Sequence, residues 1–314
     1  CARHGVDIGG IEALPLGALE RLAALESAID ALISPDSLRR DFFGHEQLVA
    51  TLFRAVKPDP AAVEFAERVA GVGTLAAAIR AKINPDPPDI ATILGKITGL
   101  LDSSIAGQKI RDTGPPAIDL SKINFEALAK RFKESQHKKT ELEALKAAVR
   151  AKLDQLIQLN RTRTDFAEKF EALIESYNAG SRSIEQLFDE LRTLSNSLND
   201  EEQRHVRESL SEEELVIFDI LIRPAPDLSP EERAELKKVS RVLLDRLKEL
   251  LVLNWRQKSS ARSQVKLAIE DVLDGGLPPA YGKPLFEDKC SVLFEHFYES
   301  YPERHAGVYA AYSP

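Results

Sequence analysis

Residues 164–198 read TDFAEKFEALIESYNAGSRSIEQLFDELRTLSNSL, and the spacing of their apolar positions decides the fold class. The first set of apolar residues recurs every three or four positions: Phe166, Phe170, Leu173, Ile174 and Tyr177. The second set repeats this pattern: Ile184, Leu187, Phe188, Leu191, Leu194 and Leu198. Such spacing places one apolar stripe on each of two helices, with charged residues opposite. Gly180, between the two sets, suits the left-handed residue that ends a helix.

The helical pattern extends outward to residues 117–223, which contain no proline and a single glycine, Gly180. Strands and tight turns depend on glycine and proline, so a stretch of this length without them predicts long helices. No segment shows the sustained period-two alternation of β-branched residues that is typical of a strand. The sequence therefore predicts an all-α protein, a bundle-like array of many helices in two subregions with no significant sheet.

Several predicted helices begin with a recognisable cap. Ser183, Ser211 and Ser229 are each followed three residues later by Gln or Glu, which is the capping-box pattern. These serine hydroxyls can accept hydrogen bonds from the free amides of a helix start. We expect helices over the following ranges: 16–33, 36–56, 60–82, 89–105, 231–253, 259–274 and 285–301. A break at Gly275-Gly276-Leu277-Pro278-Pro279 is expected to separate the last two.

Glycine and proline are distributed unevenly along the chain. Residues 1–120 hold 11 of the 16 glycines and 9 of the 17 prolines. This predicts a punctuated first part and a nearly continuous helical body. We therefore divide the chain into a helical connector region at 1–112, a linker at 113–121 and a C-terminal helical domain at 122–314.

The overall composition narrows the class of protein. Of the 314 residues, 43% are hydrophobic and 29% charged, with a net charge of −8, which is ordinary for a soluble globular protein. This charge argues against a protein that mainly coats nucleic acid. No apolar run is long enough to cross a membrane, and no signal peptide is recognisable. The two cysteines are too few for a disulfide framework, so a cytoplasmic location is expected. Because the chain begins with Cys1 and not methionine, we expect it to be a piece of a longer protein.

A search for catalytic motifs finds none. Gly95-Lys96 lacks the leading glycine and the following Ser or Thr of a phosphate-binding loop. The six histidines show no metal-ligand spacing. We therefore expect no catalytic residue, no cofactor-binding residue and no metal ligand in this chain.

One acidic cluster allows a second interpretation. Glu287-Asp288-Lys289, with Asp271 and Asp274 upstream, imitates the acids and lysine of a metal-dependent nuclease. The residues fall where a helix is expected to begin, and acids there complement the helix dipole. We favour this second role for the three residues.

Two basic clusters are candidate contacts for a partner or for DNA. The first comprises Lys130, Arg131, Lys133, Lys138 and Lys139, and the second follows Trp255 and comprises Arg256, Lys258, Arg262 and Lys266. Basic side chains beside an aromatic ring can bind phosphates and stack on a base. Because the net charge is negative, we favour a solvated helix face, with Trp255 packed in the core.

Residues 200–214 carry seven acids against Arg204 and Arg207. Such a run can dock onto a basic partner surface. More often it is a solvated helix start, and this is the interpretation that we favour.

A series of short sequence motifs, which we call strings, indicates a family resemblance. Their sequences and positions are LNRTRTDF at 159–166, YNAGS at 177–181, LSEEEL at 210–215, FDIL at 218–221, LNWRQK at 253–258, IEDVLD at 269–274, KC at 289–290 and YESY at 298–301. In this order and spacing they resemble the C-terminal helical region of the R (restriction, motor) subunit of type I restriction–modification enzymes. The resemblance covers about residues 120–302 and, more weakly, 16–112. One position departs from the family pattern, since Asn254 stands where an acid is expected before the Trp-Arg pair.

The resemblance implies a parent protein that uses ATP and Mg²⁺ to translocate duplex DNA and cleaves it, with the helicase and nuclease motifs upstream of this region. No catalytic residue is carried over to this chain, which is expected to dock the motor subunit onto the modification and specificity subunits of the methyltransferase core. Arg161 and Arg163, in the first string, join the two basic clusters as candidate contacts. The alternative is a DNA-binding helical module that guides duplex DNA to the motor.

Overall fold

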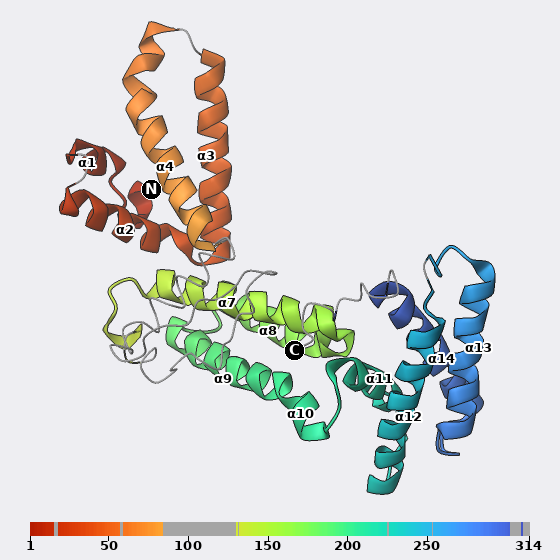
Figure 1. Cartoon of the computed structure of the whole chain (residues 1–314). Helices are drawn as coiled ribbons and strands as arrows, with labels where there is room; N and C mark the ends of the chain where they lie inside the picture. The colour runs from red at the N-terminus through yellow and green to blue at the C-terminus, as the bar shows by residue number, and fades with distance from the viewer. Residues whose placement is uncertain are drawn as a thin grey trace, which may run out of the picture. The chain divides into compact units, whose positions relative to one another are not determined.

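The computed structural model describes residues 1–15, 18–56, 59–83, 130, 132–224, 226–252, 254–301 and 309. Over these ranges the chain forms helices and no strand, which confirms the predicted all-α class (Figure 1). The predicted helix at 89–105 and the predicted linker at 113–121 lie outside the described residues, so the division at 112 and 122 stays a prediction. Among the described helices, none is both long and apolar enough to span a bilayer.

The described residues form two compact units, each assembled from separate parts of the chain. The first combines residues 1–83, 130–152 and 168–197, and the second combines residues 153–167 and 198–309. The helices of the first unit are η1 (Ala2–His4), α1 (Ile8–Ala13), α2 (Leu19–Ile33), α3 (Asp36–Val56), η2 (Pro60–Phe65) and α4 (Ala66–Ile83), with parts of α7 (Lys138–Leu159), α8 (Thr164–Asn178) and α9 (Ile184–Glu202).

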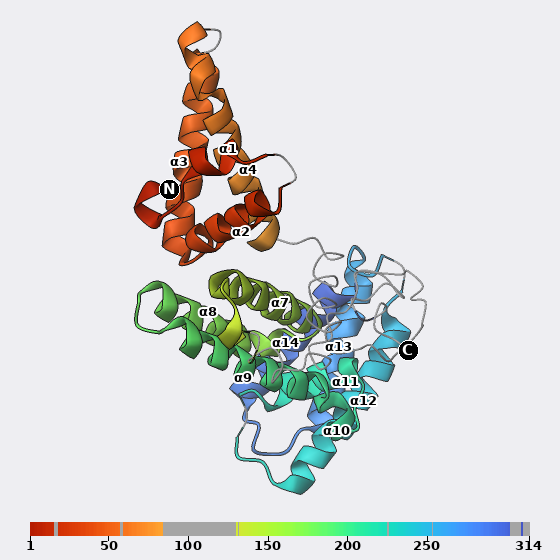
Figure 2. The same cartoon turned by 90° about the vertical axis from the view of Figure 1, so that its left-hand side faces the viewer.

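A long hairpin of α3 and α4 dominates the N-terminal part of the first unit (Figures 1 and 2). The helix α1 packs against α4, and α2 packs against both helices of the hairpin. Leu32 and Ile33 of α2 meet Leu75 and Ile79 of α4 in a small apolar core. The predicted range 36–56 matches α3, whereas the predicted helix at 60–82 divides into the 3₁₀ helix η2 and the α-helix α4.

A polar network joins the start of α3 to α7 and α8 within the first unit. The Asp36 carboxylate accepts hydrogen bonds from Arg39 (2.8 Å), Lys146 (3.2 Å) and Asn178 (3.1 Å). Glu143 accepts from Arg39 at 3.0 Å and from Lys146 at 2.9 Å. Burial alone would raise the pKa of Asp36, but Lys146 and Arg39 outweigh it and hold this pKa below its usual value. The two carboxylates, Asp36 and Glu143, are therefore neutralised by the two cations, Arg39 and Lys146.

The sequence signals around residues 178–186 have the predicted geometry. Gly180 ends α8 with φ of +75°, in the left-handed region that favours glycine. Ser183 and Gln186 form a reciprocal capping box, with N–H donors at 2.8 Å and 3.2 Å. Phe132 stacks on Phe188 of α9, with ring centroids 4.1 Å apart. The stripe predicted on α9 is therefore a core-facing stripe.

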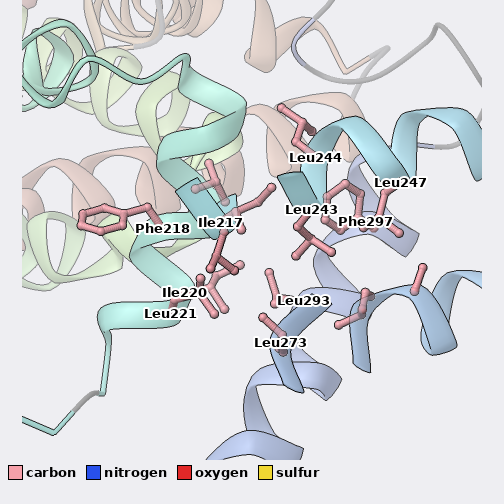
Figure 3. Packing of buried hydrophobic residues seen from close by; sticks show 14 of the residues in the cluster. Ile217, Phe218, Ile220, Leu221, Leu243, Leu244, Leu247, Leu273, Leu293 and Phe297 are labelled. Atoms are coloured by element: carbon pink, nitrogen blue, oxygen red, sulfur yellow. The ribbon is translucent and has the colours of Figure 1, made fainter. Parts of the chain in front are cut away.

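The second unit is organised around α11 (Glu212–Ile222), which is buried on all sides after its acidic first turn. Every residue from 215 to 221 is buried, and α12 and α14 pack against this helix. The other helices of the unit are η4 (Arg161–Arg163), α10 (Arg204–Glu208), α12 (Pro230–Leu250), α13 (Ser259–Gly276) and α14 (Lys283–Ser300). Figure 3 shows Ile217 and Leu221 of α11 facing Leu243 of α12 and Leu293 of α14. A helix with this pattern folds only when its neighbours enclose it.

The capping boxes predicted at Ser211 and Ser229 are both present, and they start α11 and α12. Trp255 lies in the core of the unit, as predicted, and donates its indole N–H to the carbonyl of Tyr301 at 2.9 Å. Asn254, which departs from the family pattern, has a φ of +56°. Asparagine tolerates this left-handed backbone better than most residues, which explains its place before Trp255.

The aromatic residue Tyr309 closes the second unit from the C-terminal side. Its hydroxyl donates to the carbonyl of Leu159, at the end of α7, at 2.7 Å. Its ring lies 5.8 Å from that of Tyr301. Residues 150 positions apart are thus held together by one buried hydrogen bond.

The predicted break at Gly275-Gly276-Leu277-Pro278-Pro279 does separate the last two helices, but it begins two residues later than expected, because α13 continues through both glycines and ends at Gly276. The reason is a close helix–helix contact: a β-carbon added at Gly276 would lie 2.5 Å from Val239 Cγ2 of α12. At Gly275 a β-carbon would meet no atom within 4 Å. Glycine is thus required for packing at one of the two positions only.

This contrast gives a paired prediction. Gly276→Ala is expected to destabilise the protein by about 1–3 kcal/mol, because the new methyl group overpacks the α12–α13 contact. Gly275→Ala is expected to stabilise it by about 0.5–1 kcal/mol, because alanine is the better helix former and the site is open. Urea denaturation followed by the fluorescence of Trp255 measures both changes. Equal effects of the two substitutions would contradict this account.

Candidate functional site

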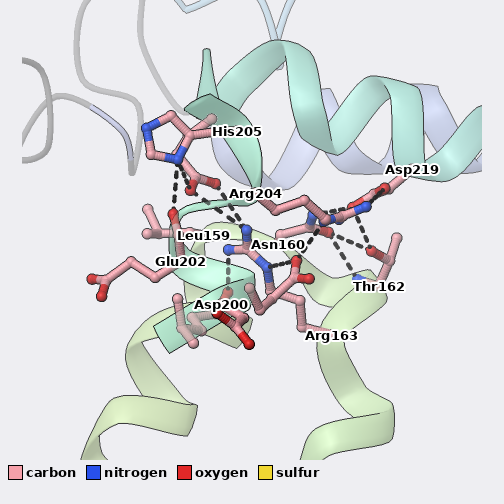
Figure 4. A network of polar contacts seen from close by, with 12 residues as sticks. Leu159, Asn160, Thr162, Arg163, Asp200, Glu202, Arg204, His205 and Asp219 are labelled. Atoms are coloured by element: carbon pink, nitrogen blue, oxygen red, sulfur yellow. Dashed lines mark hydrogen bonds and ion pairs between the residues drawn. The ribbon is translucent and has the colours of Figure 1, made fainter. Parts of the chain in front are cut away.

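A fully buried carboxylate of the second unit lies on its most apolar helix. Asp219 is 0% exposed and is the only acid between residues 215 and 222 of α11. Its carboxylate accepts hydrogen bonds from Asn160 at 2.7 Å and from Thr162 at 3.3 Å. Arg204 of α10 donates two further hydrogen bonds to it, one of them at 2.8 Å (Figure 4). A buried carboxylate is tolerated only with such compensation.

Arg163 forms a second branch of this network (Figure 4). Its side chain is 1% exposed, and it donates to Glu201 at 2.9 Å and to Glu212 at 3.2 Å. Glu201 also accepts from Arg204 at 2.9 Å, which links the two branches. The sequence suggested Arg163 as a contact to a partner or DNA, but a buried guanidinium held by two carboxylates does not reach the surface. We call the connected set of Asn160, Thr162, Arg163, Glu201, Arg204, Glu212 and Asp219 the buried network.

The buried network also accounts for much of the acidic run at residues 200–214. Glu201 and Glu212 belong to it, and Glu213 pairs with Lys248 of α12. Glu208 pairs with Lys237 of the same helix, and Glu214 completes a helix cap. The predicted helix start is present, because Glu212, Glu213 and Glu214 form the first turn of α11, and several acids of the run also pair with the chain's own basic residues.

The geometry of the buried network indicates a structural role, which is to fix the positions of neighbouring helices. The carboxylates of Asp219 and Glu201 are both held by guanidinium groups, so neither is positioned to take a proton from a substrate. The hydrogen bonds join η4, α10 and α11 at fixed geometry. The network thus holds the central helix α11 in place.

The cluster at residues 130–139 is only partly described. Lys130 and Lys133 are exposed, and Lys139 is half-buried, whereas Arg131 lies outside the described residues. Lys138 pairs with Glu185 at 3.1 Å and lies 5.7 Å from the centre of the Phe132 ring. The structure therefore uses Lys138 within the first unit and leaves Lys130 and Lys133 on its surface.

The second cluster forms a continuous basic edge, which we call the basic ridge and define as Arg256, Lys258, Arg262 and Lys266. Lys258 precedes α13, and Arg262 and Lys266 follow it at intervals of four on that helix. Arg262 donates to the carbonyl of Arg256, and Arg256 donates to the carbonyl of Glu299 at 2.9 Å. Arg161, which is exposed, pairs with the carboxylate of Glu299. The structure thus brings the second cluster and Arg161 together on the second unit.

The nuclease interpretation of residues 287–289 does not fit the structure. Lys289 is buried and donates to the carbonyl of Arg223 at 3.0 Å, and burial lowers the pKa of its ammonium group. Glu287 is exposed and pairs with Lys283. The part of the chain that the structure describes contains no group of three or more side chains placed to hold a metal ion. The favoured role in a helix start is also wrong, because α14 begins at Lys283 and its first turn carries no acid.

An exposed apolar surface lies at the end of the α3–α4 hairpin in the first unit. We call this surface the apolar tip and define it as Val49, Leu52, Val56, Val63 and Phe65, which are 40–71% exposed. The stripe at positions 49, 52 and 56 faces Phe65 and Val69 across a groove of about 470 Å³. Single exposed apolar residues are ordinary, but a contiguous set around a groove marks an interaction surface.

Sequence reasoning missed the buried network and the apolar tip. The single acid in the apolar run LVIFDILI at 215–222 was a usable signal for Asp219, because such a residue must find partners. The apolar tip gave no such signal, since its spacing is that of any amphipathic helix.

The chain was compared with known proteins. A family model described as type I restriction enzyme HindI endonuclease subunit-like, C-terminal, matches residues 3–288. No curated protein and no solved structure matches the chain. The family match agrees with the resemblance carried by the short strings, and it extends through the N-terminal part of the chain. The chain therefore belongs to the family of C-terminal regions of HindI-like type I restriction enzyme endonuclease subunits.

Proposed function

We propose that this region docks the endonuclease subunit onto the methyltransferase core of a type I restriction enzyme, built of modification and specificity subunits. The observation that carries the proposal is the apolar tip, where five large apolar side chains are exposed and four of them line one groove. A region that belongs to one subunit of an enzyme has other subunits as its natural partners. On this proposal, ATP hydrolysis with Mg²⁺ and DNA cleavage belong to other parts of the endonuclease subunit.

The chemistry of the apolar tip suits an apolar surface of another protein. Burying a large aliphatic side chain contributes about 1.5–3 kcal/mol, so a few half-exposed residues are enough for a stable anchor. Protein interfaces concentrate their binding energy in such apolar centres surrounded by polar residues. Arg68 and Asp59 border the groove and supply that polar rim.

Leu52→Asp is expected to weaken binding of the endonuclease subunit to the modification–specificity complex by about tenfold or more, because it places a charge where the proposed interface buries an apolar side chain. The measurement is titration of the full endonuclease subunit against that complex, followed by size exclusion. The matched control is Leu267→Asp on α13, since Leu267 is 57% exposed and Leu52 is 56% exposed. The control should bind as the unchanged protein does.

Two results would count against the docking proposal. The first is equal binding of the Leu52→Asp and Leu267→Asp variants. The second is a large fall in the Tm of the Leu52→Asp chain by itself, because this would mean that the chain already covers its own apolar tip.

A further inference from the structure

A cavity of about 520 Å³ lies where α1, α2 and α4 pack against one another in the first unit (Figures 1 and 2). This volume is within the range of about 300–1,000 Å³ that is usual for sites of small ligands. All three helices contribute aliphatic side chains to its walls: Ile8, Ile11, Leu25 and Leu75. In such a cavity the few polar groups decide which ligand can bind.

Glu12, near the end of α1, brings a carboxylate to this cavity. Its Oε1 atom is buried and has no hydrogen-bond partner in the part of the chain that the structure describes. Buried polar atoms are normally hydrogen-bonded, because an unsatisfied one loses its hydration without compensation. The terminal torsion of a glutamate side chain is soft, so either oxygen can turn toward a donor in the cavity.

Gly71 of α4 makes the room for this carboxylate. A β-carbon at position 71 would lie 1.9 Å from Glu12 Oε1, whereas a β-carbon at Gly73 would meet no atom within 4 Å. Glycine inside a helix is less favourable than alanine. At position 71 this loss of helix stability leaves space for a charged group.

The other charged side chains of the cavity favour a cationic ligand. Arg21 of α2 donates its Nη1 to the carbonyls of Glu12, at 3.2 Å, and Leu14, at 2.7 Å. Its guanidinium therefore binds the backbone at the end of α1. Glu67 of α4 also lines the cavity and is exposed. Two carboxylates and one guanidinium leave the lining with a net charge of −1, which attracts a positive charge.

We propose that this cavity binds a primary ammonium group on an aliphatic chain, as a free amine or as a lysine side chain of another protein. The ammonium donates to the carboxylate of Glu12, and the methylene groups pack on the aliphatic walls. A metal ion fits less well, because the described residues contain no group of three or more side chains placed to hold one. The site is independent of the apolar tip, because Glu67 and Gly71 lie on a different face of α4 from Arg68 and Val69, which line the groove.

The test uses the full 314-residue chain at neutral pH, with methyl-labelled isoleucine and leucine. The methyl NMR signals of Ile8 and Ile11 are followed during titration with two probes. One is n-pentylamine, which is cationic at this pH, and the other is n-pentanol, which has the same carbon chain without the charge. Pentylamine is expected to bind about tenfold more tightly, because its ammonium forms a charge-assisted hydrogen bond. Equal affinities, or no shift of these signals with the amine, would overturn the proposal.

Four variants test the role of the carboxylate. Glu12→Gln should weaken the binding of pentylamine about tenfold and leave that of pentanol unchanged. Its control, Glu26→Gln, removes the same charge from an exposed position of α2 and should bind both probes normally. Gly71→Ala should also weaken amine binding, because its methyl group displaces the carboxylate, whereas Gly73→Ala should not. If Gly71→Ala fails to fold, Glu12→Gln still decides: amine affinity equal to that of Glu26→Gln would overturn the proposal.

Two further probes distinguish the sources of the ammonium group. Diaminopentane represents a free amine, and Nα-acetyl-lysine methylamide represents a lysine side chain. Tighter binding of the blocked lysine would assign the site to a partner protein, and tighter binding of the diamine would assign it to a free amine. The Leu52→Asp variant, which tests docking, should bind both probes as the unchanged chain does.

Discussion

Asp219→Ala is expected to destabilise the second unit by about 3–5 kcal/mol, which is the usual cost of removing one partner from a buried ion pair. The carboxylate is 0% exposed and receives hydrogen bonds from Asn160, Thr162 and Arg204. Without it, the guanidinium of Arg204 loses its principal counter-charge, and a cavity opens beside α11. Much of the stability of an ordinary domain would be lost with this one side chain.

The single tryptophan of the chain makes this effect measurable in the right unit. Trp255 is buried in the second unit, so its fluorescence follows the unfolding of that unit in urea. Circular dichroism, in contrast, follows helices of both units. The Asp219→Ala substitution should therefore lower the urea midpoint measured by Trp255 fluorescence more than the urea midpoint measured by circular dichroism.

The matched control for this prediction is Asp271→Ala. Asp271 also lies on a helix of the second unit and also pairs with an arginine, at 3.0 Å, but both partners are exposed. Exposed pairs contribute about 0–1 kcal/mol, so this variant should unfold nearly as the unchanged protein does. If the two aspartate variants unfolded at the same urea concentration, the buried network would not have the structural role that we describe.

His296 is expected to make the second unit sensitive to mild acid. Burial, with a smaller contribution from Arg161, lowers its pKa from 6.5 to about 4. The folded state therefore binds fewer protons than the unfolded state between these values, and stability falls as the pH is lowered through this window. A shift of this size corresponds to about 3 kcal/mol between pH 6.5 and pH 4.

The variant His296→Gln isolates this effect. Glutamine keeps a polar group beside Ser300, whose hydroxyl lies 3.3 Å from His296 Nδ1, but it does not titrate. Carboxylates add their own acid sensitivity to both proteins, so the relevant quantity is the difference between the two curves. Urea midpoints from Trp255 fluorescence at pH 6.5, 5.5 and 4.5 should fall more steeply for the histidine protein. Parallel curves would contradict the prediction.

The local features of this fold were predictable because local chemistry decides them. The capping boxes at Ser183, Ser211 and Ser229 were recognisable from three-residue spacing, and each one is formed. Gly180 was recognisable because a left-handed residue between two helices favours glycine. Trp255 was correctly expected in the core, since a large indole gains most from burial.

The features that sequence reasoning missed depend on residues far apart in the chain. Arg163 looks like a surface cation until Glu201 and Glu212 are brought around it. Gly276 looks like a helix breaker until Val239 of the neighbouring helix occupies the space of its β-carbon. Leu52 is exposed because no other helix packs over it. The spacing of apolar residues along its own helix does not reveal whether a neighbouring helix covers them.

The hydrogen bond from Tyr309 to Leu159 also sets an order of events during translation. The carbonyl at the end of α7 leaves the ribosome 150 residues before its partner hydroxyl. At about 5–20 residues per second, this gap lasts about 8–30 seconds. During this time the nascent second unit lacks the hydrogen bond from Tyr309 to Leu159. The apolar residues of α11 stay exposed until α12 and α14, which pack against them, have been synthesised. A ribosome that pauses in this interval holds the chain at its most aggregation-prone stage, when chaperones have most to protect.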